Sequence, residues 1–258
     1  MKKTFMMGAA LAALAIAPAV AADLPAQTYS KAPAMVAPPS WTGFYLGGSV
    51  GGGWNTNSWT NVNSIASTLN IGAPAGNGNA NGILGGFQGG FNYQIGPKVV
   101  IGIEGEYDFA NIKGDTFLKP LDHPGLAMTK EKSIASVTGR IGGLYHDDIL
   151  IYLKGGWAWS QFKYDVSTAA GEGVTGTYPT LTDNRNGYTL GFGTEYKLDR
   201  NWSAKIEYDY YDFGRKTVFF PQGSIPLPST STGPFRVDIA QQTHVLKVGA
   251  NYNFGWPY

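Results

Sequence analysis

Three carboxylate side chains occupy alternate positions of one short segment, at Glu104, Glu106 and Asp108. Successive side chains of a β-strand point to opposite faces, so these acids would share one face. Paired carboxylates are among the groups that perform general acid–base catalysis. The other phase of residues 99–109 is apolar and ends in Tyr107 and Phe109. The segment is thus a two-faced strand, and its charged face has two interpretations, catalysis or ion pairing.

Basic residues on the corresponding phase of other segments favour ion pairing. Glutamates supply four acids on this phase, and lysine or arginine supplies four bases. Because an unpaired buried charge is costly, equal numbers of both signs in a narrow interior indicate mutual pairing. If the strands enclose this face as the lumen of a barrel, the sequence predicts a lumen ion-pair network. Its members would be Glu104, Glu106, Arg140, Lys154, Glu195, Lys205, Glu207 and Lys247.

Other chemistry has little support in the sequence. The three histidines, His123, His146 and His244, are far apart, and no nucleophile motif accompanies them. The chain has no cysteine, and no spaced histidine or carboxylate cluster suggests a metal site. A net charge of +1 gives no reason to expect nucleic acid as a partner. We expect no catalytic residue, no metal and no cofactor.

The elements that would position the charges are eight segments with period-two alternation. Three short turns, at 96–98, 146–148 and 199–201, alternate with four long polar stretches, at 55–81, 111–132, 163–186 and 214–241. Outer-membrane barrels alternate short periplasmic turns and long extracellular loops in this way. We predict an all-β fold, an eight-stranded antiparallel transmembrane β-barrel, with strands near 41–54, 82–95, 99–110, 133–145, 149–162, 187–198, 202–213 and 242–254.

The apolar phases of these segments carry no formal charge, as expected of a lipid-facing surface. Tyrosine and tryptophan cluster at the segment ends, which is typical of interfacial belts. The predicted aromatic girdle comprises Trp54, Tyr107, Trp157 and Trp159 at the outer rim and Tyr145, Tyr196 and Trp202 at the periplasmic rim.

The beginning of the chain has the features of a secretory signal. Two lysines precede an apolar run, and small residues follow, so we expect a signal peptide over residues 1–22 with cleavage after Ala21 or Ala22. Residues 23–40 contain four prolines and no periodicity, which predicts a periplasmic tail. The barrel would then occupy residues 41–258.

Several motifs resemble a known family. Residues 22–25 (ADLP), 41–48 (WTGFYLGG), 201–208 (NWSAKIEY) and 244–254 (HVLKVGANYNF) are similar to the small alphaproteobacterial outer-membrane immunogenic, or "porin family", proteins, whose domain is an OmpA-like barrel. The resemblance covers nearly the whole chain apart from the long loops. It implies an integral protein of the Gram-negative cell outer membrane.

The last segment also resembles the signal read by the barrel-assembly machinery. Lys247, Gly249, Tyr252 and Phe254 fit a polar-x-Gly-x-x-aromatic-x-aromatic pattern, although residues 255–258 follow the terminal aromatic. The expected partners are outer-membrane lipid, lipopolysaccharide and this machinery, together with an extracellular partner held by the loops.

The sequence favours a structural protein that stabilises the outer membrane and displays loops for recognition or adhesion. The alternatives are a narrow porin-like channel, a lipid-modifying enzyme built around His244 and a soluble ligand-binding barrel. Haem binding has been attached to some relatives of the family, and the resemblance would make His123, or Tyr178 and other loop tyrosines, the candidate ligands here.

Overall fold

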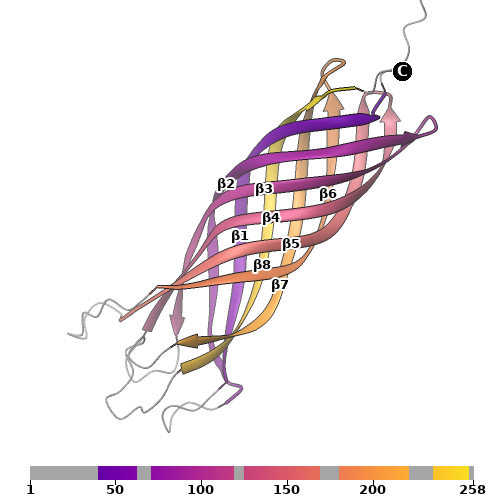
Figure 1. The fold of residues 1–258 in the computed structure, drawn as a ribbon. Helices are drawn as coiled ribbons and strands as arrows, with labels where there is room; N and C mark the ends of the chain where they lie inside the picture. Colours follow the sequence, from indigo (N-terminus) through magenta and orange to yellow (C-terminus); the bar gives the residue numbers. More distant parts are fainter. Residues whose placement is uncertain (1–39, 63–70, 119–124, 169–179, 221–234, 256–258) are drawn as a thin grey trace, which may run out of the picture. The chain divides into compact units, whose positions relative to one another are not determined.

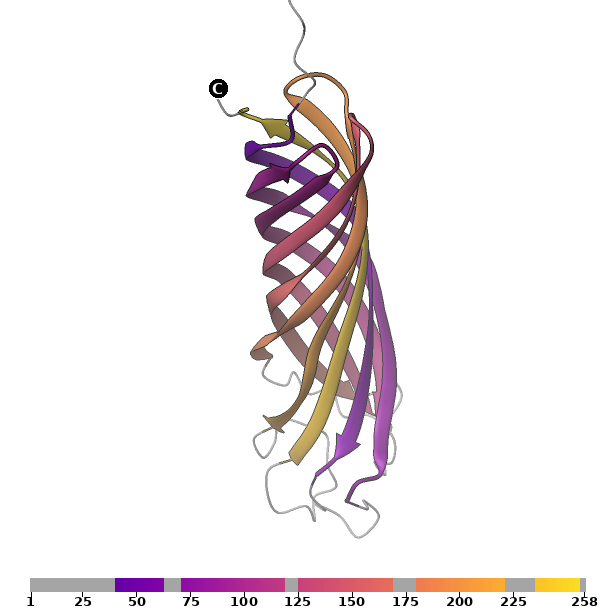
Figure 2. The same ribbon diagram turned by 90° about the vertical axis from the view of Figure 1, so that its right-hand side faces the viewer.

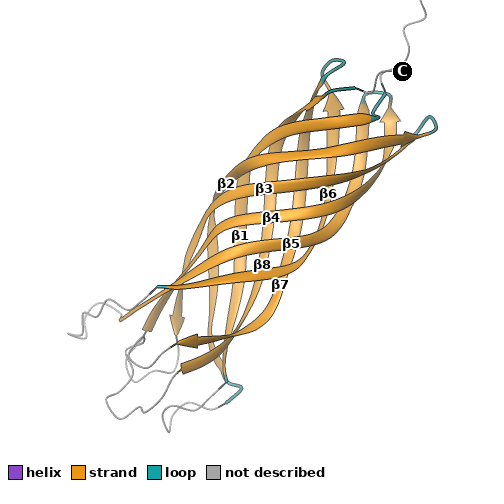
Figure 3. Ribbon diagram, viewed as in Figure 1, coloured by secondary structure: helices purple, strands orange, loops and turns teal. Residues whose placement is uncertain are grey.

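A computed structural model describes residues 40–62, 71–118, 125–168, 180–220 and 235–255, with side chains for all but a few strand-end residues. These residues form strands and no helix, and therefore no helix that could span a membrane (Figure 3). The strands are β1 (Gly43–Asn61), β2 (Pro74–Ile95), β3 (Val99–Leu118), β4 (Gly125–His146), β5 (Ile149–Thr168), β6 (Leu181–Lys197), β7 (Trp202–Phe220) and β8 (Phe235–Asn253).

The strands form one closed antiparallel barrel. Each strand pairs with the next in the sequence, and β1 also pairs with β8, so that Tyr45 lies opposite Asn253. Figures 1 and 2 show the strands wound steeply around the barrel axis. The β6–β7 ladder runs from Tyr188 opposite Asp212 to Lys197 opposite Ser203, and at this level of the barrel closure leaves no sheet edge unpaired among the described residues. Such closure is the condition for crossing a lipid bilayer with strands. The predicted fold class is confirmed.

The connections between strands differ at the two ends of the barrel. Two to four residues join β2 to β3, β4 to β5 and β6 to β7, close to the three predicted short turns. We call this end of the barrel the short-turn end, and the opposite end, from which the longer connections leave, the long-loop end.

The predicted long loops are wrong over much of their length, because the strands continue into them. β1 extends to Asn61 instead of ending near residue 54, and β4 begins at Gly125 instead of near residue 133. The extensions were missed because the apolar phase changes sides. Along β8, Leu246 and Val248 point outward, whereas Val237 and Ile239, farther toward the long-loop end, are buried inside. This change of side is the one expected where water replaces lipid outside a membrane barrel.

The barrel interior is filled in layers. On β5 the inward residues run from Leu150 and Tyr152 through Lys154 to Phe162 and Tyr164, all of them buried. An apolar cluster that includes Trp41, Val100 and Leu144 fills the short-turn end, and a larger one that includes Trp59, Ile112, Phe220 and Ile239 fills the long-loop end. Charged side chains occupy the space between the two apolar layers.

The predicted signal peptide and nearly all of the predicted tail lie outside the described residues. From the tail only Ser40 is described, and its carbonyl oxygen accepts a hydrogen bond of 2.5 Å from Lys197 Nζ. The Lys197 ammonium also lies 4.7 Å from the ring centre of Trp41, as a cation–π contact.

Candidate functional site

The charged layer is organised around Lys154, which projects inward from β5. Its Nζ lies 3.2 Å from Glu104 Oε1, 3.2 Å from Glu106 Oε2 and 2.8 Å from Glu207 Oε1. These acids come from β3 and β7, so the lysine bridges strands that are not its neighbours in the sheet. All of these side chains are almost completely buried. The charges are therefore paired with one another and shielded from solvent.

A second cation, Lys247 on β8, extends the same cluster toward the long-loop end. Its Nζ forms ion pairs with Glu106, with Glu207 Oε1 at 3.2 Å and with Asp209 Oδ2 at 2.8 Å. Lys205 on β7 lies 3.4 Å from Glu207 Oε1. Glu207 is thus shared by three lysine ammonium groups.

Arg140, on β4, holds the side of the cluster nearer the short-turn end. Its NH1 lies 3.3 Å from Glu195 Oε2, and its Nε donates a hydrogen bond of 2.8 Å to Asn92 Oδ1. The guanidinium carbon lies 4.5 Å from the ring centre of Tyr45 and 5.2 Å from that of Tyr152. The arginine is therefore enclosed by two aromatic rings and a carboxylate, a geometry that favours its planar, weakly hydrated cation.

The structure brings all eight residues of the predicted network into one buried cluster, and it adds members that the sequence analysis left out. Asp108 and Asp209 contribute two further carboxylates, at 3.8 Å and 2.8 Å from Lys247 Nζ. Asp209 follows Glu207 by two residues, so strand periodicity alone could have included it. Six carboxyl groups therefore face four cationic groups.

Two tyrosine hydroxyls complete the cluster. Tyr152 donates a hydrogen bond of 2.5 Å to Glu207 Oε2, and Tyr45 donates one of 2.9 Å to Glu104 Oε2. Their rings require glycine opposite, because a Cβ at Gly90 or Gly193 would approach the Tyr45 or Tyr152 hydroxyl to within 2.4 Å or 2.6 Å. These glycines leave the room that the lumen tyrosines fill.

The geometry of the cluster favours charge neutralisation over chemistry. Glu104, Glu106 and Glu207 present oxygens within 4.8 Å of one another, which is the spacing of a metal site. However, the Lys154 ammonium lies at hydrogen-bond distance from all three, where a cation would have to sit. The same contacts occupy the carboxylate oxygens that acid–base catalysis would need.

A separate buried carboxylate, Glu131, lies in the apolar layer at the long-loop end. It accepts hydrogen bonds from Ser160 Oγ at 2.7 Å and from Thr243 Oγ1 at 3.0 Å, and no cation pairs with it among the described residues. Residues 111–132 are a predicted loop, so the sequence does not indicate that the Glu131 side chain lies inside the barrel.

The two histidines that lie in the described ranges do not form a common site. His244 lies on the outer surface, stacked 5.6 Å from Trp54, and its Nδ1 is 2.7 Å from the Tyr208 hydroxyl. His146 ends β4 at the opposite end of the barrel. His123 and Tyr178, the candidate haem ligands, lie outside the described residues.

The structure places the predicted girdle residues on the outer surface of the barrel. Trp157 and Trp159 on β5 are 51% and 45% exposed, and Tyr107 on β3 is half-buried against Phe87 and Phe109. The remaining members, all at least 44% exposed, are Trp54, Tyr145, Tyr196 and Trp202.

The residues of the predicted assembly signal divide between the two faces of β8. Lys247 points into the charged cluster, whereas Tyr252 and Phe254 lie outside with ring centres 5.2 Å apart. Gly249 lies against Ser49 of β1, where an added Cβ would come within 3.0 Å of the serine Cβ. The signal itself remains a prediction.

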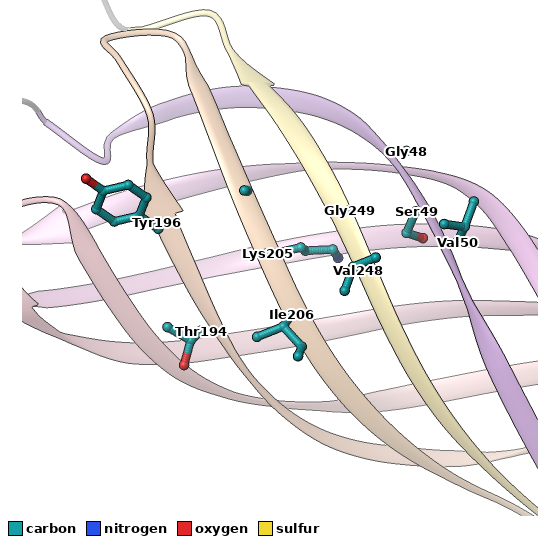
Figure 4. Close-up of a pocket in the computed structure, with 10 residues that line it drawn as sticks. Gly48, Ser49, Val50, Thr194, Tyr196, Lys205, Ile206, Val248 and Gly249 are labelled. Carbon is teal, nitrogen blue, oxygen red and sulfur yellow. The ribbon is translucent and has the colours of Figure 1, made fainter.

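A shallow groove lies on the outer face of β6, β7, β8 and β1 (Figure 4). Its volume is about 600 Å³, and Gly48, Val50, Ile206 and Val248 contribute to its lining. The outward residues are apolar or small, so the groove presents a hydrocarbon-like surface of the kind that contacts lipid chains.

Comparison with known proteins agrees with this architecture. The family model described as "Outer membrane protein beta-barrel domain" matches residues 7–254. The chain is 27% identical over 257 residues to a 31 kDa outer-membrane immunogenic protein of Brucella melitensis, covering 95% of this chain and 98% of that protein. It is 31% identical over 227 residues to the 25 kDa outer-membrane immunogenic protein of the same organism, covering 86% and 90%.

A solved structure shares the fold. The outer membrane protein OprG from Pseudomonas aeruginosa superposes with a TM-score of 0.53 at 14% identity, covering 82% of this chain and 97% of that chain. The predicted family resemblance and outer-membrane location are confirmed. The chain belongs to the outer membrane protein β-barrel domain family, and it is similar to the Brucella outer-membrane immunogenic proteins.

Proposed function

We propose that this outer-membrane barrel is a closed structural element that stabilises the membrane and displays its long-loop end at the cell surface. The observation that carries the proposal is the filled interior. Lys154 and its carboxylate partners occupy the middle of the lumen with side chains that are at most 2% exposed. An eight-stranded barrel has an interior just wide enough for side chains to fill, so these contacts leave no continuous water path.

Apolar layers on both sides of the charged cluster support the same proposal. Water or ions passing through the lumen would have to cross the layer around Leu150 and the layer around Phe162, both completely or almost completely buried. The apolar side chains that make up most of each layer offer a passing polar solute few hydrogen bonds, so each layer acts as a barrier. The narrow porin-like channel is therefore the less favoured function.

The surface role is supported by the extension of the strands beyond the outer aromatic residues. β5 continues nine residues past Trp159, to Thr168, and β1 continues seven residues past Trp54, to Asn61. With the short turns in the periplasm, these extensions would raise the loops clear of the membrane surface, where recognition or adhesion takes place. We assign no catalytic activity, because the acids of the lumen are paired and His244 contacts aromatic side chains.

Planar-bilayer recording of the refolded full chain tests whether the barrel is closed. Folding is checked first by the electrophoretic mobility of unheated and boiled samples. We expect no steady, stepwise current at either polarity. Reproducible conductance steps from protein that shows the mobility shift would refute the closed barrel and establish the channel.

Cysteine labelling in intact cells tests the proposed orientation. The chain has no cysteine, so Phe219→Cys at the long-loop end and Lys98→Cys in a short turn each introduce a single thiol. A membrane-impermeant maleimide should label Phe219→Cys in intact cells and Lys98→Cys only after the outer membrane is permeabilised. The reverse pattern would overturn the orientation.

A further inference from the structure

A cluster of lysines lies on the outer surface of β3, β4 and β5. Lys113, Lys130 and Lys163 are direct cross-strand partners, and Lys132 lies two residues from Lys130. We call these four residues the lysine row. Like charges placed directly opposite on neighbouring strands destabilise a sheet. The arrangement therefore has an unfavourable energy that a bound anion would relieve.

The lysine row has no carboxylate partner within ion-pair distance among the described residues. Asp115 and Asp165 lie farther toward the long-loop end, opposite Met128, and Asp165 accepts a hydrogen bond from Thr180. Lys216 on β7 provides the contrast, because it is exposed on the same half of the barrel and pairs with Asp183. The lysines of the row thus differ from Lys216, which forms an ion pair with a carboxylate.

A groove of about 450 Å³ opens on the same outer surface, next to the lysine row on the side nearer the short-turn end. Ser133 and Gln161 are direct cross-strand partners in its wall, and Gln161 Nε2 donates a hydrogen bond of 3.2 Å to Asn184 Oδ1. Tyr107 and Trp159 line the groove one step farther toward the short-turn end. Aromatic, amide and cationic rows therefore follow one another along this face.

The order of the three rows matches the depth profile of a membrane surface. Tyrosine and tryptophan settle at the level of the headgroups, between hydrocarbon and water. Amide and hydroxyl side chains one step above them can donate and accept hydrogen bonds with sugar hydroxyls. Lysine ammonium groups another step above them bind phosphate as point charges.

We propose that the lysine row and the adjoining groove bind the phosphorylated sugar headgroup of an outer-leaflet glycolipid, the chemistry of lipopolysaccharide. The phosphate lies among Lys113, Lys130, Lys132 and Lys163, the sugar contacts Ser133, Gln161 and Asn184, and the acyl chains follow the apolar surface below Trp159. This inference rests on the proposed orientation, which places the long-loop end in the outer leaflet.

Titration of the refolded full chain with bis-phosphorylated lipid A, in an uncharged detergent and followed by native mass spectrometry, tests the site. The test variant is Lys130→Gln/Lys163→Gln, and the matched control is Lys98→Gln/Lys216→Gln, which removes two exposed lysines elsewhere. We expect the test variant to bind about tenfold more weakly than the wild-type chain, since two charge contacts are lost and each is weakened by the surrounding water. The control should bind as the wild-type chain does. Dephosphorylated lipid A should bind the wild-type chain more weakly than bis-phosphorylated lipid A does. Its affinity should be the same for the wild-type chain and for the test variant.

Each contrary outcome identifies its cause. Equal binding by the test variant and the wild-type chain, or equal binding of the two forms of lipid A, would overturn the site. Displacement of lipid A by an equal concentration of inorganic phosphate would show that the site holds phosphate alone, which would overturn the glycolipid assignment. A folded barrel that conducts but binds lipid A through the lysines would overturn the closed-barrel proposal and leave this site intact.

Discussion

Replacing Lys154 by methionine, which keeps the length of the side chain and removes its charge, isolates the contribution of the central cation. In the wild-type chain its Nζ lies within 3.4 Å of oxygens from Glu104, Glu106, Glu207 and Asp209. The variant leaves the six carboxyl groups of the cluster facing three cations instead of four.

The expected loss of stability follows from this geometry. Removing one partner of a buried ion pair costs about 3–5 kcal/mol, because the remaining charge stays buried without compensation. Four carboxylates lose a partner here, while Lys205 and Lys247 still neutralise part of the charge. We therefore expect a loss of about 3–5 kcal/mol in the free energy of unfolding, or roughly two to four orders of magnitude in the equilibrium constant.

Urea unfolding in lipid vesicles, followed by tryptophan fluorescence, measures this loss. Lys216→Met is the matched control, because the same substitution there breaks an ion pair whose lysine side chain is 51% exposed. Exposed pairs contribute about 0–1 kcal/mol, so the control should stay close to the wild-type chain. Adding Glu207→Gln to Lys154→Met should recover part of the loss. If Lys154→Met and Lys216→Met unfold alike, the buried network does not stabilise the barrel and the reasoning fails.

Two further predictions concern the lipid-facing surface and a turn. Leu153→Arg, at the middle of the outward face of β5, should cost about 2–4 kcal/mol in the same assay, against about 0–1 for Gln161→Arg near the interface; equal costs would contradict the assigned membrane level. In the turn before β7, Asp199 accepts backbone hydrogen bonds of 2.7 Å from both Trp202 and Asn201, which lowers the pKa of its carboxyl. The Asp199 carboxylate should therefore stabilise the folded protein fully above the ordinary aspartate pKa of about 3.9. This stabilisation should disappear as the pH falls through the lower pKa that the carboxyl has in the folded protein. An NMR titration midpoint at or above the ordinary value would refute this.

Strand periodicity was sufficient to predict which side chains face the lumen. Arg140, Lys154 and Glu195 all share the phase opposite to the lipid-facing residues of their segments, and all three are buried in the charged cluster. Their partners could not be predicted in the same way. Lys154 on β5 contacts acids of β3 and β7 across the lumen, and these contacts depend on the stagger of the strands around the barrel. The stagger is set by the register of every strand pair, which the alternation of one segment does not encode.

The halves of the strands nearer the long-loop end were not predicted, for a different reason. Trp59 and Phe162 belong to the inward apolar layer at the long-loop end, whereas Trp54 and Trp159 on the same strands point outward. The β-bulge between Glu131 and Ser133 also breaks the alternation of β4 at this level. The apolar side chains change from one face of the strand to the other where lipid is expected to give way to water. A strand predicted from one continuous apolar face therefore ends at that level, although the real strand continues.

Hydrogen exchange of the lysine ammonium groups tests the central claim of a filled lumen most directly. In NMR spectra of the full chain with ¹⁵N-labelled lysine in micelles, the Nζ protons of Lys154 and Lys247 should be protected from water, since both side chains are fully buried and paired with carboxylates. The exposed Lys98 and Lys216 should exchange too fast to be observed. Fast exchange at Lys154 and Lys247, at the rate of the exposed lysines, would show that water fills the lumen and would contradict the account.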